Sequence, residues 1–134
     1  MTTTTELRDL PILSGLSDAA FARLTACGEL RARPGQVLAL EDDPGAGAFL
    51  VVEGTVHVEL RSRTFEVGPG QVVGELALLV PDAHRVARVR AATAVRCVPI
   101  ARDDFVELVE TEPPFAVALL RELARRLVEA HSDR

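Results

Sequence analysis

Residues 73–91 read VGELALLVPDAHRVARVRA, and this stretch decides how the whole chain is interpreted. Gly74 has no Cβ, so the backbone there can approach a ligand closely or adopt a positive φ. The carboxylate of Glu75 can accept hydrogen bonds from hydroxyl groups. Residues 76–79 can form one short helical turn, whose free N–H groups attract an anion, and Arg85 offers a fork of donors that suits two phosphate oxygens. A small ligand with a hydroxyl group beside a singly charged phosphodiester would use all of these features.

The same stretch resembles the phosphate-binding cassette of cyclic nucleotide-binding domains, the sensor module of the catabolite activator protein, protein kinase A regulatory subunits and cyclic-nucleotide-gated channels. The family pattern runs roughly Phe-Gly-Glu-(Leu/Ile)-Ala-Leu, then a short variable gap, then Arg-(Ser/Thr/Ala)-Ala-x-Val. The matching positions are Gly74, Glu75, Leu76, Ala77, Leu78, Arg85, Ala87 and Val89. The resemblance implies that Arg85 binds the cyclic phosphate and that Glu75 accepts the ribose 2′-hydroxyl. It also implies that Leu76 and Ala77 contribute backbone N–H groups.

Two positions depart from the family pattern. Val73 replaces the usual Phe, which is a mild change. Val86 stands where many cyclic-AMP binders carry a Ser or Thr that donates to the phosphate, so one hydrogen bond is missing. His84 is either a replacement donor or an ordinary loop histidine. Ligand identity and affinity therefore depend on Val86.

Composition limits the classes of protein that this chain can represent. Its 134 residues suffice for one domain with a modest core. The formal net charge of −5 argues against nucleic acid or an acidic membrane as the main partner. No segment is apolar enough to span a membrane and the N-terminus lacks a signal pattern, so we expect a cytoplasmic protein. Cys27 and Cys97 have no metal-ligand spacing, and we expect reduced structural thiols.

Short apolar segments punctuated by Gly and Pro turns predict an antiparallel β-structure. The expected strands are residues 29–33, 36–40, 48–53, 55–61, 64–67, 86–91 and 94–100. In the strand 86–91 the alternation predicts that Val89 and Ala91 face the interior and that Arg88 and Arg90 face solvent. The predicted fold is mainly β with flanking helices: a double-stranded antiparallel β-roll, jelly-roll-like, of eight or so strands. It has N-terminal helices and a C-terminal helix pair.

Helix signals flank this roll on both sides. Ser14 or, better placed, Ser17 caps a helix over residues 18–27. Asp103 or Asp104 begins a helix that runs to residue 109, and Thr111 is a candidate N-cap for the last helix, with two prolines in its first turn. The apolar stripe of that helix consists of Ala116, Leu119 or Leu120, Leu123 and Leu127, with Arg121, Arg125, Arg126 and Glu129 away from it. We expect residues 1–9 to be disordered or loosely ordered and residues 10–134 to form one domain, with the roll at about 29–100 and the helices at about 102–131.

The resemblance implies a regulatory sensor that binds a cyclic mononucleotide, cyclic AMP in the first place and cyclic GMP as a possibility, through Gly74, Glu75, Leu76, Ala77, Arg85 and Val86. Binding would draw the C-terminal helices over the ligand and pass the change to an unidentified effector protein. The last helix either packs on the roll, pairs with a second copy in a homodimer, or closes over the base. No catalytic triad, zinc spacing or P-loop is present, so we expect no enzyme activity, no metal and no resident cofactor. This chain alone is expected to contact neither DNA nor membrane. The alternative hypothesis is a degenerate roll that binds no nucleotide and serves as a dimerisation or protein-interaction module.

Overall fold

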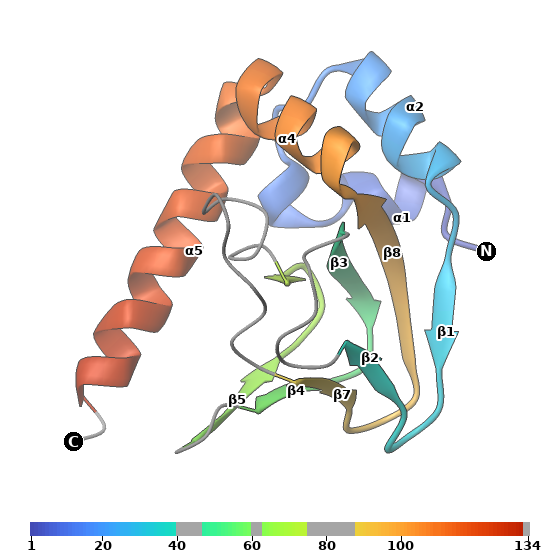
Figure 1. The fold of residues 1–134 in the computed structure, drawn as a ribbon. Coiled ribbons are helices and arrows are strands. Elements are labelled where there is room, and N and C mark those ends of the chain that lie inside the picture. The colour runs from blue at the N-terminus through green and yellow to red at the C-terminus, as the bar shows by residue number, and fades with distance from the viewer. Residues whose placement is uncertain (40–46, 60–62, 75–87, 133–134) are drawn as a thin grey trace.

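The computed structural model describes residues 1–39, 47–59, 63–74 and 88–132, which form a β-roll with helices at both ends (Figure 1). The N-terminal helices lead into eight strands within these ranges, and two helices follow the last strand. In chain order the elements are α1 (Thr4–Arg8), the 3₁₀-helix η1 (Pro11–Leu13), α2 (Asp18–Ala26), β1 (Leu30–Ala32), β2 (Val37–Ala39), β3 (Gly47–Glu53), β4 (Val56–Glu59), β5 (Thr64–Val67), β6 (Val72–Val73), β7 (Arg88–Ala91), β8 (Val95–Ala101), α4 (Arg102–Thr111) and α5 (Pro113–Ser132).

The strands form two antiparallel sheets of four strands each. Sheet A has the order β1-β8-β3-β6, and sheet B has the order β2-β7-β4-β5. Every described strand pair is antiparallel, and the β3–β8 ladder at the centre of sheet A extends from Gly47 opposite Ala101 to Glu53 opposite Arg96. The predicted fold class, an antiparallel roll with flanking helices, is therefore confirmed.

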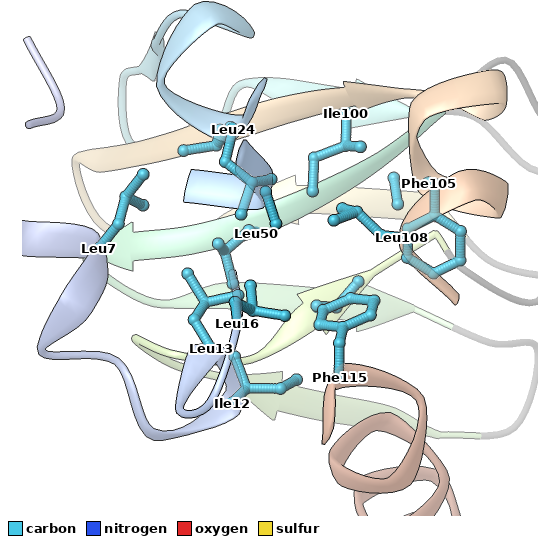
Figure 2. Packing of buried hydrophobic residues seen from close by; sticks show 14 of the residues in the cluster. Leu7, Ile12, Leu13, Leu16, Leu24, Leu50, Ile100, Phe105, Leu108 and Phe115 are labelled. Carbon is cyan, nitrogen blue, oxygen red and sulfur yellow. The ribbon is translucent and has the colours of Figure 1, made fainter. Parts of the chain in front are cut away.

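Sheet A is buried on both faces, and this produces two separate hydrophobic cores. Along β3, Leu50 points toward the helices whereas Val51 points into the roll, as the alternation of a strand requires. The helix-side core combines Leu50 with side chains from the N-terminal helices, α4 and α5 (Figure 2). The roll core fills the space between the two sheets with Val, Ala and Cys97. The two faces of β3 thus link the helices to the roll.

The N-terminal residues are ordered, which corrects the expectation that residues 1–9 are disordered or loosely held. Helix α1 begins with a capping box in which the Thr3 side chain accepts from the Glu6 N–H and the Glu6 carboxylate accepts from the Thr3 N–H. Leu7 is 0% exposed in the helix-side core. The capping box and this burial together offset the entropy lost on ordering the segment.

The predicted N-cap is correct for α2 and wrong for α4 and α5. Ser17 caps α2 as predicted, because its hydroxyl oxygen accepts from the Ala20 N–H. Helix α4 instead begins at Arg102 with Ala101 as an N-cap that makes no side-chain bond, and both predicted caps, Asp103 and Asp104, lie in its first turn. The negative charges there are favourable to the helix dipole without capping it.

The α4–α5 junction lies one residue beyond the expected position. Thr111 belongs to α4, where its hydroxyl donates to the Glu107 carbonyl, so it is not the N-cap of α5. Glu112 ends α4, and the two prolines open α5 as predicted. Fixed φ angles of proline suit a helix start that follows this break directly.

Only part of the predicted stripe on α5 packs on the roll. Phe115 and Leu119 are buried, and Leu123 is half-buried against the helix-side core. Leu127 is 63% exposed, although the periodicity placed it in the same stripe. The buried face instead continues through Glu122 and the half-buried Arg126. The sequence pattern had placed Arg126 away from the apolar stripe.

Candidate functional site

Gly74 lies at the end of β6, the edge strand of sheet A, and has a φ of 85°. Strand β6 pairs with β3 through Phe49 opposite Val73 and Leu50 opposite Val72, and both valines are buried, at most 1% exposed. The buried valines fix the position of the strand end. At that end a positive φ favours glycine, because other residues rarely adopt this conformation. Gly74 therefore has the positive φ that the sequence allowed for it, and its role in ligand binding stays a prediction.

The remaining predicted site residues lie outside the described residues. These are Glu75, Leu76, Ala77, Arg85 and Val86, together with the alternative donor His84. Their roles stay predictions. The structure does describe both ends of the segment that contains them.

The two described ends of the segment that follows Gly74 belong to different sheets. The segment leaves from the edge of sheet A and returns at Arg88, the first residue of β7. Strand β7 is an inner strand of sheet B, paired with β2 and β4. Val89 and Ala91 are buried and Arg88 is exposed, as predicted for an alternating strand. The candidate segment is thus anchored in a different sheet at each end.

A charged cluster covers the outer face of β4 and β7. The carboxylate of Glu59 accepts from Arg88 Nε at 2.8 Å and from Arg90 Nη2 at 3.0 Å, and these bonds, with that from Arg90 the stronger influence, lower the pKa of Glu59. His57 Nδ1 lies 3.5 Å from Arg90 Nη2. Arg90 is half-buried rather than solvated, because it pairs with Glu59 across the strands. Both arginines of this strand are thereby engaged on its outer face.

Helix α5 reaches the other end of the segment through Arg126. Its Nη2 donates to the Val72 carbonyl oxygen at 2.6 Å, and the same nitrogen lies 3.3 Å from Glu122 Oε2. Glu122 is 5% exposed. Sequence reasoning missed both residues, although their i,i+4 spacing beside Leu119 and Leu123 was a usable indication of an ion pair on the inward face.

In the part of the chain that the structure describes, no group of three or more His, Cys, Asp or Glu side chains is arranged to hold a metal ion. No helix within the described ranges is both long enough and apolar enough to cross a membrane.

Comparison with known proteins identifies relatives of the chain. The family model of the cyclic nucleotide-binding domain matches residues 29–112, which is more than half of the chain. Glutaminase 2 of Bradyrhizobium diazoefficiens is 34% identical over 120 residues, which cover 85% of this chain and 19% of that enzyme. The chain spans 19% to 30% of the length of three curated relatives that it matches.

Solved structures extend the likeness to nearly the whole chain. A cAMP-binding acyltransferase from Mycobacterium smegmatis superposes with a TM-score of 0.78 at 30% identity, covering 94% of this chain and 41% of that one. The N-terminal domain of a transcriptional regulator from Streptomyces coelicolor gives a TM-score of 0.64 at 34% identity, with 95% of each chain covered.

Proposed function

The chain belongs to the cyclic nucleotide-binding domain family, and we propose that it is a regulatory sensor that binds a cyclic mononucleotide. Cyclic AMP is the first candidate and cyclic GMP the second. The observation that carries the proposal is Gly74, which has a φ of 85° where the family pattern Gly-Glu-Leu-Ala-Leu begins. The description of the Mycobacterium smegmatis relative as cAMP-binding favours the adenine nucleotide.

Within this proposal each site residue has a chemical role. Arg85 pairs its guanidinium with the cyclic phosphate, and Glu75 accepts the ribose 2′-hydroxyl. The backbone N–H groups of Leu76 and Ala77 donate to the phosphate, as free N–H groups at a helix start do. Val86 supplies no donor, which costs about 1.5–3 kcal/mol and weakens the site by about one to two orders of magnitude.

A second candidate function is an interaction module that binds no nucleotide. Two observations favour it: Val86 lacks the expected donor, and residues 115–130 of α5 contain neither Ser nor Thr to recognise a base. Gly74, Glu75 and Arg85 count against it, because a scaffold needs no such charged group beside a glycine of positive φ. Neither candidate involves catalysis.

We propose further that α5 transmits the signal and pairs with a second copy of the chain. Four apolar side chains of α5 remain exposed, between 45% and 67% each: Val117, Leu120, Leu127 and Val128. Ligand binding would shift the population of α5 positions in proportion to its preference for one of them. The effector that reads this shift is unidentified.

The proposal is tested by dye-monitored thermal unfolding with cyclic AMP, cyclic GMP and their non-cyclic monophosphates. Ligand at a hundredfold excess over its Kd adds about 2.7 kcal/mol, which raises the unfolding midpoint by about ten degrees. We expect a rise with one cyclic nucleotide and no rise in Arg85→Ala. A flat response of the natural chain to the whole panel at millimolar ligand favours the interaction module.

A further inference from the structure

Glu122 is a buried carboxylate on the inward face of α5, which it shares with apolar side chains and the half-buried Arg126. It lies between Leu119 and Arg126 on the side of α5 that packs on the roll, and it is 5% exposed. Burial of a charged carboxylate is unfavourable unless an opposite charge or hydrogen bonds compensate it. Its Oε2 atom makes no hydrogen bond and depends on the ion pair with Arg126 at 3.3 Å.

The Arg126 guanidinium occupies a defined place between this carboxylate and strand β6. Its Nη2 donates to the Val72 carbonyl at 2.6 Å. The carbonyl of the preceding residue, Gln71, accepts from Val51 of β3, so the Val72 carbonyl points away from β3 at the open edge of sheet A. Arg126 therefore satisfies a backbone group that none of the described strands of sheet A pairs with.

We propose that Glu122 positions Arg126 on the Val72 carbonyl and that this contact couples α5 to the ligand segment. Glu122 is thus a positioning residue for ligand binding, an inference that rests on the proposed function. The contact lies two residues before Gly74, with the buried Val73 between them. A ligand held at Gly74 and a helix held at Val72 share one short strand, so each stabilises the other, and the coupling is reciprocal.

The experiment measures amide hydrogen exchange of residues 123–129 and cyclic nucleotide affinity in the same variants. Glu122→Gln keeps the size of the side chain and removes its charge. We expect α5 amides to exchange at least about tenfold faster without ligand, since local opening becomes easier. Affinity for the nucleotide that stabilises the natural chain should fall about fivefold or more. Glu129→Gln, an exposed change on the same helix, is the matched control and should alter neither quantity.

A second pair of variants tests the other half of the contact. Arg126→Gln should reproduce both effects of Glu122→Gln, whereas Arg125→Gln, which changes the exposed neighbour, should not. If the coupling is reciprocal, ligand binding must also change the exchange of the α5 amides, an effect that a purely structural contact between α5 and the roll does not predict. Ligand should increase the protection of α5 amides in the natural chain and in both controls, and this gain should disappear in Glu122→Gln and Arg126→Gln.

The outcomes separate this inference from the proposed function. If Glu122→Gln matches Glu129→Gln in exchange, Glu122 does not position α5. If exchange accelerates while affinity and ligand-induced protection are unchanged, the contact is structural and the coupling is refuted. If the natural chain binds no cyclic nucleotide, the proposed function fails and the coupling fails with it, whatever the exchange rates are.

Discussion

At the scale of single residues, Glu29 explains why the N-terminus is ordered. Its side chain is 9% exposed. Its carboxylate accepts from Arg31 Nε at 2.7 Å, from the Thr2 hydroxyl at 2.8 Å and from Arg96 Nη1 at 3.0 Å. Arg96 also donates to Glu6 of α1 at 2.6 Å. These contacts tie the first residues to β1 and β8, and no sequence pattern indicates a cluster assembled from positions this far apart.

The same contacts predict how acid affects stability. Hydrogen bonds, first from Arg31, lower the pKa of Glu29 from 4.5 to about 2. Because the pKa of Glu29 is lower in the folded than in the unfolded chain, the ionised carboxylate contributes its full stabilisation at pH values above the unfolded pKa of 4.5. This contribution to the free energy of unfolding is lost as pH falls from about 4.5 toward 2. We expect Glu29→Gln to lower the urea midpoint at neutral pH, with a difference from the natural chain that narrows near pH 3.

The exposed Glu110 of α4 provides the control for this prediction. Glu110→Gln should leave the urea midpoint nearly unchanged at both pH values. If the urea midpoint of Glu29→Gln lies below that of the natural chain by the same amount at neutral pH and at pH 3, the shape of the Glu29 side chain rather than its charge stabilises the fold.

The candidate site also shows what single residues reveal in a sequence. Gly74 could be singled out from the sequence because the need for glycine at a positive φ is a local property of the backbone. The structure shows Gly74 with such a φ. Arg126 was placed on the polar side and Glu122 was not singled out, because charged residues on a helix are usually solvated. Their burial depends on the carbonyl of Val72, a tertiary contact across 54 residues that helical periodicity does not contain.

At the scale of elements, α2 carries the clearest capping prediction. The Ser17 hydroxyl accepts from the Ala20 N–H at 3.1 Å and donates to Glu112 Oε2 at 3.1 Å, while the Ser17 N–H donates to Glu112 Oε1 at 2.9 Å. We expect Ser17→Ala to lower the free energy of unfolding by about 1 kcal/mol, as for other lost N-caps. Chemical denaturation measures this change.

Ser14 is the matched control, because it is an exposed serine three residues earlier. Ser14→Ala should change the free energy of unfolding by less than about 0.5 kcal/mol. Equal losses in the two variants would mean that the cap contributes nothing specific to α2.

The elements differ in how far sequence could predict them. Strands such as β3 and β8 have apolar runs between turns, and their positions follow from period and punctuation. Strand β6 was missed, because two residues carry no periodicity. Thr111 was predicted to be the N-cap of α5 but is the last residue of α4, because the helix break falls one residue later, at Glu112. From sequence alone, a threonine at the end of one helix cannot be distinguished from a threonine that caps the next.

At the scale of the whole molecule, α5 has two faces with different tasks. Phe115, Leu119 and Glu122 face the roll, while Val117, Leu120, Leu127 and Val128 are exposed on the opposite side of the helix by its 3.6-residue period. Val117, Leu120 and Leu127, with steps of three and seven residues, have the spacing of a, d and d positions of a coiled coil, and Val128 follows at an e position. Because packing on the roll buries only one face of α5, the opposite apolar face remains available to contact a partner helix at the same time.

This arrangement predicts a homodimer that forms through α5. We expect the natural chain to sediment as a dimer at high concentration and Leu120→Glu/Leu127→Glu as a monomer. Carboxylates on that seam would be buried without partners. Because both leucines are exposed within one chain, 67% and 63%, the double variant should keep its far-ultraviolet circular dichroism and its nucleotide response. Arg125→Glu adds the same charge outside the stripe and should leave the dimer intact. If the natural chain remains monomeric at every concentration, the homodimer prediction is wrong. The exposed stripe would then be a binding surface for another protein, since an apolar surface of this length on a long helix favours burial.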